Sequence, residues 1–157
     1  MTRWLPLCLL FLATFLVSDA RADASKDALA PLANIEKALR SSDEALFKAQ
    51  WHADGYAKNL VGGSGNTGES MFRQGARKKW FPRPDASKLE VLGKGEAAIV
   101  SCDIWSWEKE KAVDRVDVLL VKSKDGYVLL GAGEKRAEID ALAKRWLDKQ
   151  PLAPAGK

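Results

Sequence analysis

Apolar residues recur every three or four positions over residues 28–40, which is the spacing of an amphipathic α-helix with one buried face. The apolar positions are Leu29, Leu32, Ile35 and Leu39. Ser41 followed by Glu44 fits a capping box for a second helix that reaches Trp51. We therefore predict two successive helices in the N-terminal part of the chain.

A run of glycine and small polar residues at 62–68 interrupts the helical spacing and predicts a loop. A short helix is expected over Glu69–Trp80, and Pro82 and Pro84 prevent it from continuing. From Leu89 onward the apolar period changes to that of β-strands.

The predicted strands are Leu89–Leu92, Ala97–Trp107, Val113–Lys122 and Tyr127–Ala132. Lys124-Asp125-Gly126 is a hairpin turn signal, because glycine supplies the positive φ that such turns require. Glu108–Ala112 is a charged loop of similar length, so consecutive strands pair antiparallel. An amphipathic helix within Glu134–Lys149 follows. Helices, then an antiparallel meander, then one helix predict an α+β domain.

The first 22 residues have the pattern of a secretory signal peptide. Arg3 precedes the apolar run Leu5–Val17, and Ala20-Arg21-Ala22 fits the small-residue cleavage motif. The run, about 13 residues long, is too short to cross a bilayer of roughly 30 Å as a helix. We expect a periplasmic or secreted protein that begins near Asp23 and does not associate with the membrane after cleavage.

The expected mature chain has the size of one domain, residues 23–150, followed by a disordered tail, residues 151–157, rich in proline, alanine and glycine. The whole chain carries a net charge of +4. The leader has two basic residues and one acidic residue, so the mature chain is weakly basic. It lacks the dense Lys/Arg stripe that nucleic-acid binding needs, and Arg77-Lys78-Lys79 fits a solvated helix end.

The small number of cysteine and histidine residues argues against a disulfide and a zinc site. Cys8 lies early in the apolar run, where a lipid-modified cysteine would not be found, and Cys102 is the only other cysteine. The mature chain therefore has no intramolecular disulfide, and Cys102 fits a small core residue. His52 is the sole histidine, which argues against a zinc site, and we expect no metal or cofactor.

The glycine-rich loop is close to a phosphate-binding loop. Residues 63–70 match that pattern at every fixed position except Glu69, which replaces the lysine. A glutamate at that position repels phosphate, so nucleotide binding is not expected.

The segment Trp51–Tyr56 holds the densest set of reactive side chains. His52 is a candidate general base, Asp54 a group that orients or replaces it, and Tyr56 a donor to a developing oxyanion. The segment also fits a helix end, in which Asp54 and Gly55 make the turn and Trp51 fills the core. The second interpretation is favoured.

The strand Ala97–Trp107 has apolar even-numbered positions, which suit a core, and mixed odd-numbered positions. If Trp107 pairs with Val113, the next pairs are Trp105 opposite Arg115 and Asp103 opposite Asp117. Two carboxylates then lie beside a guanidinium that can stack on an indole. Such a face suits the polar floor of a pocket or a solvent-facing sheet surface.

Several segments together resemble the nuclear transport factor 2-like superfamily. They are Trp51–Tyr56, the loop ending in Gly68, the short helix with Met71 and Phe72, and the strand segments Val118–Lys122 and Asp125–Leu129. Over residues 28–133 the chain is similar to exported, polyketide-cyclase-like (SnoaL-like) members without an assigned activity. The resemblance implies a cone-shaped, cystatin-like fold, in which a strongly curved antiparallel sheet wraps around the long helix and leaves a pocket.

The resemblance also implies candidate chemistry. Ketosteroid isomerase-like members use a carboxylate base with a tyrosine and a protonated aspartate as oxyanion donors. Asp54 or Asp103 would match the acidic roles and Tyr56 the phenol. The helix within Glu134–Lys149 departs from the family pattern. We expect it to take one of three places: over the pocket mouth, against the outside of the sheet, or in a dimer contact.

We expect a ligand-binding or interaction module without catalysis, whose ligand is an apolar or aromatic small molecule. Its candidate ligand-binding residues are Trp51, Tyr56, Asp103, Trp105, Trp107, Arg115 and Asp117. The alternative is an isomerase, cyclase or hydrolase of the same superfamily with Asp103, His52 or Asp54 as the base. A third hypothesis is a homodimeric adaptor that uses the outer sheet face or the last helix.

Overall fold

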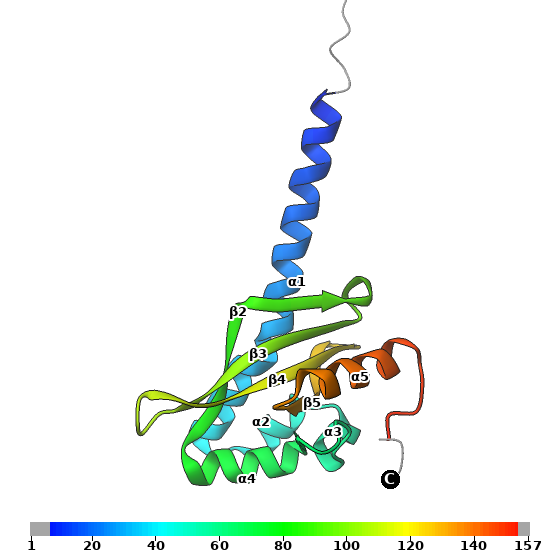
Figure 1. Cartoon of the computed structure of the whole chain (residues 1–157). Coiled ribbons are helices and arrows are strands. Elements are labelled where there is room, and N and C mark those ends of the chain that lie inside the picture. The colour runs from blue at the N-terminus through cyan, green and yellow to red at the C-terminus, as the bar shows by residue number, and fades with distance from the viewer. Residues whose placement is uncertain (1–6, 154–157) are drawn as a thin grey trace, which may run out of the picture.

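The computed structural model describes residues 7–153, with the side chains of Asp23 and of residues 25–153. Its helices are α1 (Leu7–Ser41), α2 (Glu44–Ala49), α3 (Ala53–Ala57), α4 (Gly68–Lys78) and α5 (Arg136–Leu147). Its strands are β1 (Gly65–Asn66), β2 (Trp80–Leu92), β3 (Ala97–Ser106), β4 (Lys111–Ser123) and β5 (Gly126–Gly133), and a 3-10 turn covers Gly93–Gly95. The fold is α+β, as the sequence predicts (Figure 1).

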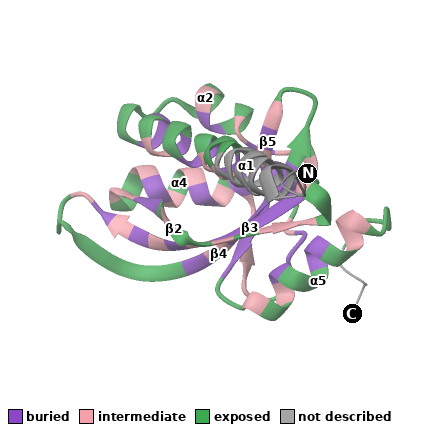
Figure 2. Ribbon diagram, turned by 90° about the horizontal axis from the view of Figure 1, so that it is seen from above, coloured by how far each residue is buried: buried purple, intermediate pink, exposed green. Residues whose placement is uncertain are grey.

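The five strands form one antiparallel sheet in the order β1-β5-β4-β3-β2. Helices α1, α2 and α4 pack on one face of the sheet, and α5 packs on the other (Figure 2). Both faces therefore carry a hydrophobic core. The prediction of a strongly curved, cone-shaped sheet is wrong, because the sheet is not strongly curled and α5 supports the face opposite α1.

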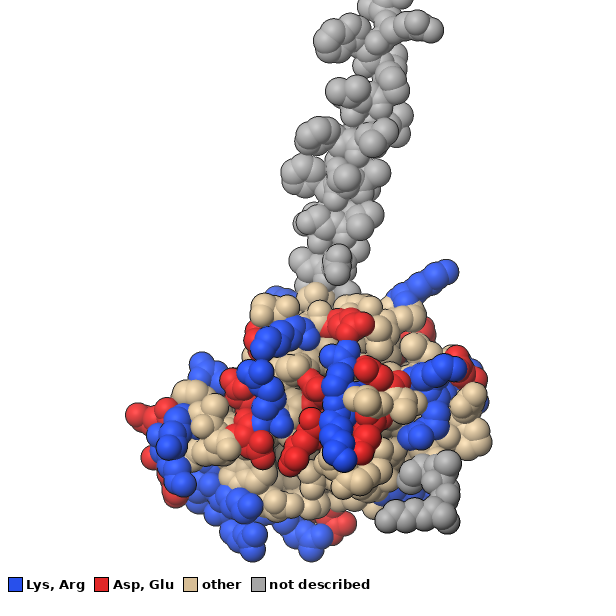
Figure 3. Space-filling view, viewed as in Figure 1, with Lys and Arg blue, Asp and Glu red and all other residues tan. Residues whose placement is uncertain are grey.

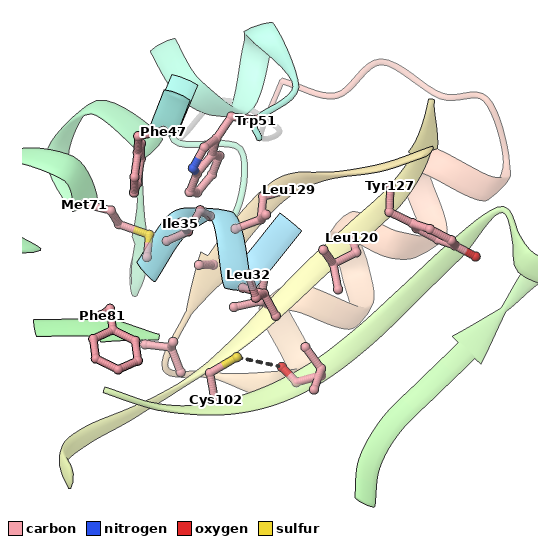
Figure 4. Close-up of a cluster of buried hydrophobic side chains, with 14 of the residues drawn as sticks. Leu32, Ile35, Phe47, Trp51, Met71, Phe81, Cys102, Leu120, Tyr127 and Leu129 are labelled. Carbon is pink, nitrogen blue, oxygen red and sulfur yellow. Dashed lines mark hydrogen bonds between the residues drawn. The ribbon is translucent and has the colours of Figure 1, made fainter. Parts of the chain in front are cut away.

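Helix α1 buries the apolar stripe that its sequence predicts. Leu32, Ile35 and Leu39 are at most 3% exposed and point toward the sheet (Figure 4 shows the first two). The helix is longer than the predicted 28–40 and ends at Ser41. Burial of this stripe removes three large aliphatic side chains from water, and each such burial stabilises the fold by about 1.5–3 kcal/mol.

The cap of α2 differs from the predicted one. Asp43, rather than Ser41, is the N-cap, and its carboxylate accepts a hydrogen bond from the Leu46 amide at 2.9 Å. The Ser41 hydroxyl instead donates to the Lys37 carbonyl at 2.9 Å in the last turn of α1. Ser42 has a positive φ of 54°, which ends α1 one residue before the cap.

The glycine-rich segment is a loop, but it is more ordered than the sequence suggests. It contains the two-residue strand β1, which pairs with the end of β5 through Gly65↔Gly133 and Asn66↔Ala132. The side-chain Nδ2 of Asn59 donates to the Gly65 carbonyl at 3.0 Å and fixes the approach to β1. Thr67 then caps α4, since its hydroxyl accepts from the Ser70 amide at 3.0 Å.

Strand β2 is much longer than the strand that the sequence predicted at Leu89–Leu92. It begins at Trp80 and passes through Pro82 and Pro84, whereas the predicted strand started at Leu89. Proline is tolerated here because β2 is an edge strand, whose outer side needs no ladder donors. The pairing with β3 is irregular between Pro84 and Leu89, so the edge is also bulged.

The three strands of the meander agree closely with the predicted ranges. The hairpin at Lys124-Asp125-Gly126 is confirmed, because Ser123 pairs with Gly126, which has a φ of 129°. The hairpin between β3 and β4 is tighter than predicted, since Ser106 pairs with Lys111.

Helix α5 is confirmed, and it packs outside the sheet. Ile139 and Leu142 are fully buried against the second face of the sheet, where Ile99 and Leu119 lie. Arg136 anchors the helix to the edge strand through an ion pair with Glu90 of β2. The helix therefore completes a core and does not cover the groove described below.

The structure describes the two ends of the chain only in part, and these ends contain the predicted leader and tail. The leader side chains and residues 1–6 lie outside the described residues, so the signal peptide stays a prediction. The predicted tail also lies partly outside them, but Leu152 within it packs against the α5-side core. No helix in the described part of the chain is both long and apolar enough to span a membrane.

Candidate functional site

A groove of about 690 Å³ lies between α4 and the face of the sheet that also packs against α1. It runs from β1 and the end of β5 to the β3–β4 hairpin. Its lining residues are Asn66, Met71, Gln74, Lys78, Trp80, Ile104, Ser106, Glu108, Lys109, Val113, Asp114, Val116, Ala132 and Glu134.

Helix α4 forms one wall of the groove. Met71, Gln74 and Lys78 lie three and four positions apart, so they share one face of the helix. The helix is held close to its neighbours at Gly75, where a Cβ atom would lie 2.9 Å from both the Leu39 side chain and the Trp80 carbonyl. Gly75 thus fixes how near α4 comes to the rest of the fold.

The floor of the groove is apolar. It consists of Ile104 on β3, Val116 on β4 and Ala132 on β5, all of which are buried. These side chains continue the cluster that packs under α1 (Figure 4 shows part of it). The same sheet face is thus a core beneath α1 and the floor of a groove beside α4.

The rim of the groove carries five exposed charges that nearly cancel. Lys78 and Lys109 are basic, and Glu108, Asp114 and Glu134 are acidic. None of the five makes an ion pair with another residue whose side chain the structure describes. The Lys78 ammonium lies over the Trp80 ring, 5.4 Å from its centroid.

The polar groups inside the groove are uncharged. Ser106 is 4% exposed and is the one buried serine, threonine, amide or charged side chain in the described part of the chain. Its hydroxyl oxygen accepts from the Lys109 amide at 3.2 Å. Gln74 and Asn66, half-buried amides, lie on α4 and β1 respectively.

The site predicted on β3 does not line this groove: by strand alternation Asp103 lies on the opposite face, whereas Trp105 and Trp107 pack against the α1-side core. Asp103, Trp105, Arg115 and Asp117 do not line it, and neither do Trp51, Tyr56 and Trp107. The odd-numbered positions of β3 are partly covered by α5, since Ala97 and Ile99 are buried there, and are more open from Ser101 onward. On that side Lys and Arg side chains are interleaved with Asp and Glu (Figure 3).

The pairing predicted for these residues is wrong by two positions. Asp103 lies opposite Arg115 instead of Asp117, and Asp117 lies opposite Ser101. The cause is the tighter hairpin together with a bulge that leaves Val113 unpaired. Because strand side chains alternate with a period of two, the shift keeps each residue on its predicted face but changes its neighbours.

On the side of the sheet away from the groove, the polar side chains at the exposed end of β3 and β4 bind one another. The Arg115 guanidinium binds Asp103 through two nitrogens, each 3.1 Å from Oδ1. Asp117 accepts a hydrogen bond from the Ser101 hydroxyl. The Arg83 guanidinium stacks over Trp105 at 4.6 Å from the ring centroid. The predicted stacking of an arginine on Trp105 therefore occurs, but with Arg83 in place of Arg115.

Trp107 and Trp51 both pack against other side chains of the fold and do not line the groove. Trp107 lies 6.0 Å from the Phe81 ring, and the Arg40 guanidinium of α1 lies 5.2 Å from both ring centroids. Trp51 is 5% exposed and packs beside Phe47 in the α1-side core, as Figure 4 shows. Both residues hold helices against the rest of the fold.

Tyr56 is engaged by a carboxylate. Its hydroxyl donates to Glu44 Oε1 at 2.7 Å, which joins α3 to α2. Burial, reinforced by this hydrogen bond and by the negative charge of Glu44, raises the pKa of Tyr56 to about 12. A phenol held in this way already donates its proton to Glu44, so it is not free to serve an oxyanion.

His52 and Asp54 fit the interpretation as a helix end. His52 is the N-cap of α3, and its Nδ1 accepts from the Asp54 amide at 3.3 Å. The imidazole ring also meets Trp146 of α5 edge-on, with centroids 5.7 Å apart. Asp54 pairs with Lys58 at 3.4 Å on the outside of α3.

Cys102 lies in the α1-side core and is fully buried. Burial, with smaller contributions from Asp117 and Asp103, raises its pKa far above the ordinary thiol value. The thiol is therefore protonated at neutral pH and is not activated as a nucleophile. Among the described residues, no group of three or more His, Cys, Asp or Glu side chains is placed to hold a metal ion.

Sequence reasoning missed the groove because it assigned the even-numbered face of β3 entirely to the core. Ser106 carried a usable signal, since it is a polar residue that continues the apolar series ending at Ile104. The α4 residues carried a second signal, because Met71, Gln74 and Lys78 mix apolar and polar groups on one helix face.

Comparison of the chain with protein-family models, curated proteins and solved structures finds no match.

Proposed function

We propose that this protein is an exported module that binds a small, largely apolar molecule in the groove between α4 and the sheet. The observation that carries the proposal is the combination of an apolar floor with a few uncharged polar groups. Ligand pockets of about 300–1,000 Å³ have this composition, and the groove falls within that range.

The proposal includes no reaction. His52, Asp54 and Asp103 were the candidate bases, and each has a structural contact away from the groove. A general base must come within hydrogen-bond reach of the proton it removes, so these residues are not placed to act on a molecule bound there.

Two further parts of the proposal rest on sequence. The order of helices and antiparallel strands supports a relationship to the nuclear transport factor 2-like superfamily. The pattern of residues 1–22 supports export, and sequencing the N-terminus of protein recovered from the periplasm or medium tests it. We expect a start near Asp23, and recovery of the intact leader only in the cytoplasmic fraction would contradict export.

Binding can be tested with N-phenyl-1-naphthylamine, an uncharged dye whose fluorescence rises in an apolar site. The variant Ala132→Leu extends the floor into the groove and should weaken dye binding by about ten-fold or more. Ala137→Leu adds the same side chain at an exposed position of α5 and should leave binding unchanged. Equal dye binding by both variants and the unmodified protein would overturn the groove as the site.

A further inference from the structure

Ser106 is an unusual residue for the interior of this fold, because no other serine, threonine, amide or charged side chain among those described is buried. Its oxygen accepts the Lys109 amide, but its own hydrogen has no acceptor among the described residues. A buried hydroxyl that leaves a donor unused costs stability unless something supplies an acceptor. Ser106 lines the groove, so a bound molecule can supply it.

Gln74 presents the complementary group from the opposite wall. Its Nε2 donates to the Ser70 hydroxyl at 2.9 Å. The Oε1 atom then remains as an acceptor without a donor among the described residues. The groove therefore has a donor on the sheet wall and an acceptor on the helix wall.

The charges of the rim disfavour an ionised ligand. Two lysines and three carboxylates surround the mouth, so a molecule with one sign of charge meets groups of the same sign as well as of the opposite sign. Moving an ionised group from water onto the apolar floor is costly unless an opposite charge accompanies it. The charged side chains are exposed, whereas the interior polar groups are neutral.

From these contacts we infer that the ligand bears an uncharged group with both a hydrogen-bond donor and an acceptor, such as a hydroxyl or a carboxamide. Ser106 donates to that group and Gln74 accepts from it, while the apolar body lies along Ile104 and Val116. This inference rests on the proposed binding function and specifies the chemical class of its ligand.

The test compares 1-octanol, octanoate and octylammonium as competitors of N-phenyl-1-naphthylamine at neutral pH, where the last two are ionised. The three share one chain and differ in the polar end. We expect 1-octanol to displace the dye at concentrations about ten-fold lower than either ion. Equal or better displacement by an ion would overturn the inference while leaving the binding function intact.

Two variants assign the hydrogen bonds. Ser106→Ala and Gln74→Ala should each weaken displacement by 1-octanol roughly three- to ten-fold, the effect of one lost hydrogen bond. Gln74→Ala should not change displacement by octanoate, because an ionised carboxylate has no hydrogen to donate to Gln74. Gln74 lies on a half-exposed helix face, so its variant remains informative if Ser106→Ala does not fold. Unchanged 1-octanol displacement in Gln74→Ala would overturn the assignment, and absence of dye binding by the unmodified protein would overturn the binding function itself.

Discussion

The carboxylate of Glu138 on α5 accepts two hydrogen bonds from Ser64 in the glycine-rich loop, one from the backbone amide at 3.0 Å and one from the hydroxyl at 2.6 Å. The two residues are far apart in sequence, and the contact ties the loop before β1 to the C-terminal helix. Since β1 supplies Asn66 to the groove wall, Glu138 helps to position that wall without touching it.

Removal of this carboxylate should loosen the loop. In Glu138→Ala, the Ser64 amide loses its acceptor, and we expect its hydrogen exchange to become faster than in the unmodified protein. The amides of the β4–β5 hairpin should keep their exchange rates, because α5 retains its apolar contacts with the sheet. Unchanged exchange at Ser64 would contradict the role assigned to Glu138.

The same contact should depend on pH. The hydrogen bonds from Ser64 lower the pKa of Glu138, with a smaller contribution from Lys135. A lowered pKa in the folded state means that the contact stabilises the fold above the ordinary carboxyl pKa and is lost as pH falls through the lowered value. Protection of the Ser64 amide should therefore persist in mild acid and disappear at lower pH. Glu138→Gln, which does not titrate, should remove this acid step.

For Gly55→Ala, helix propensity and steric contact predict changes of opposite sign in the free energy of unfolding. A Cβ atom at this position would lie 2.1 Å from the Leu130 carbonyl oxygen, because α3 comes directly against β5. Helix propensity alone predicts that Gly55→Ala gains up to about 1 kcal/mol. We expect instead a loss of about 1–3 kcal/mol in the free energy of unfolding by urea, because the backbone of β5 cannot move aside.

The matched control for Gly55 is Gly63→Ala in the neighbouring loop. There the nearest atom to an added Cβ is Glu138 Oε1 at 3.7 Å, an ordinary contact distance. Its free energy of unfolding should change by less than about 0.5 kcal/mol. A variant Gly55→Ala as stable as Gly63→Ala would show that α3 and β5 are less closely packed than described.

Periodicity in the sequence predicted most elements, because the buried stripe of a helix and the apolar runs of the central strands are both visible in it. The stripe containing Leu32 and Ile35 predicted α1, and the alternation around Val100 predicted β3. The first part of strand β2, before Leu89, was not predicted because Pro82 was interpreted only as a helix stop. Whether a proline lies on an edge strand depends on the strand order, which no local pattern contains.

The groove was harder to predict for a related reason. The pattern of β3 correctly placed Ile104 on an inward-facing side, but it could not tell whether a helix or an open space lies above that residue. That distinction depends on where α1 ends and how closely Gly75 lets α4 approach. The register around Asp103 failed because the β3–β4 turn is tighter than the charged segment suggested, and the bulge at Val113 offsets only one position of that shift.

The Asp103–Arg115 pair separates the predicted site from the observed groove. Its side chains are 39% and 57% exposed, so solvent screens their attraction. We expect Asp103→Asn to lower the free energy of unfolding by less than about 1 kcal/mol. The variant should bind N-phenyl-1-naphthylamine as the unmodified protein does, because Asp103 does not line the groove. Loss of dye binding in Asp103→Asn would return the site to the other face of the sheet.

Tyr56 should titrate well above an ordinary tyrosine. The chain has two tyrosines, so Tyr127→Phe leaves Tyr56 as the sole source of tyrosinate absorbance. Its midpoint should lie near the pKa of about 12 that burial and Glu44 impose, against about 10 for a free tyrosine. Because the folded pKa is raised, the stabilisation from the Tyr56–Glu44 contact is complete below about pH 10 and is lost as the pH rises toward the folded value.

Glu44→Ala in the same Tyr127→Phe background distinguishes the two causes of this shift. Burial is the larger cause and the Glu44 hydrogen bond the next, so the midpoint should fall but stay above the ordinary value. Tryptophan fluorescence recorded on the same samples verifies that the protein is folded at each pH. A midpoint near 10 in the folded Tyr127→Phe protein would contradict the burial of Tyr56. A fall to 10 only after Glu44→Ala would show that the carboxylate, rather than burial, holds the phenol protonated.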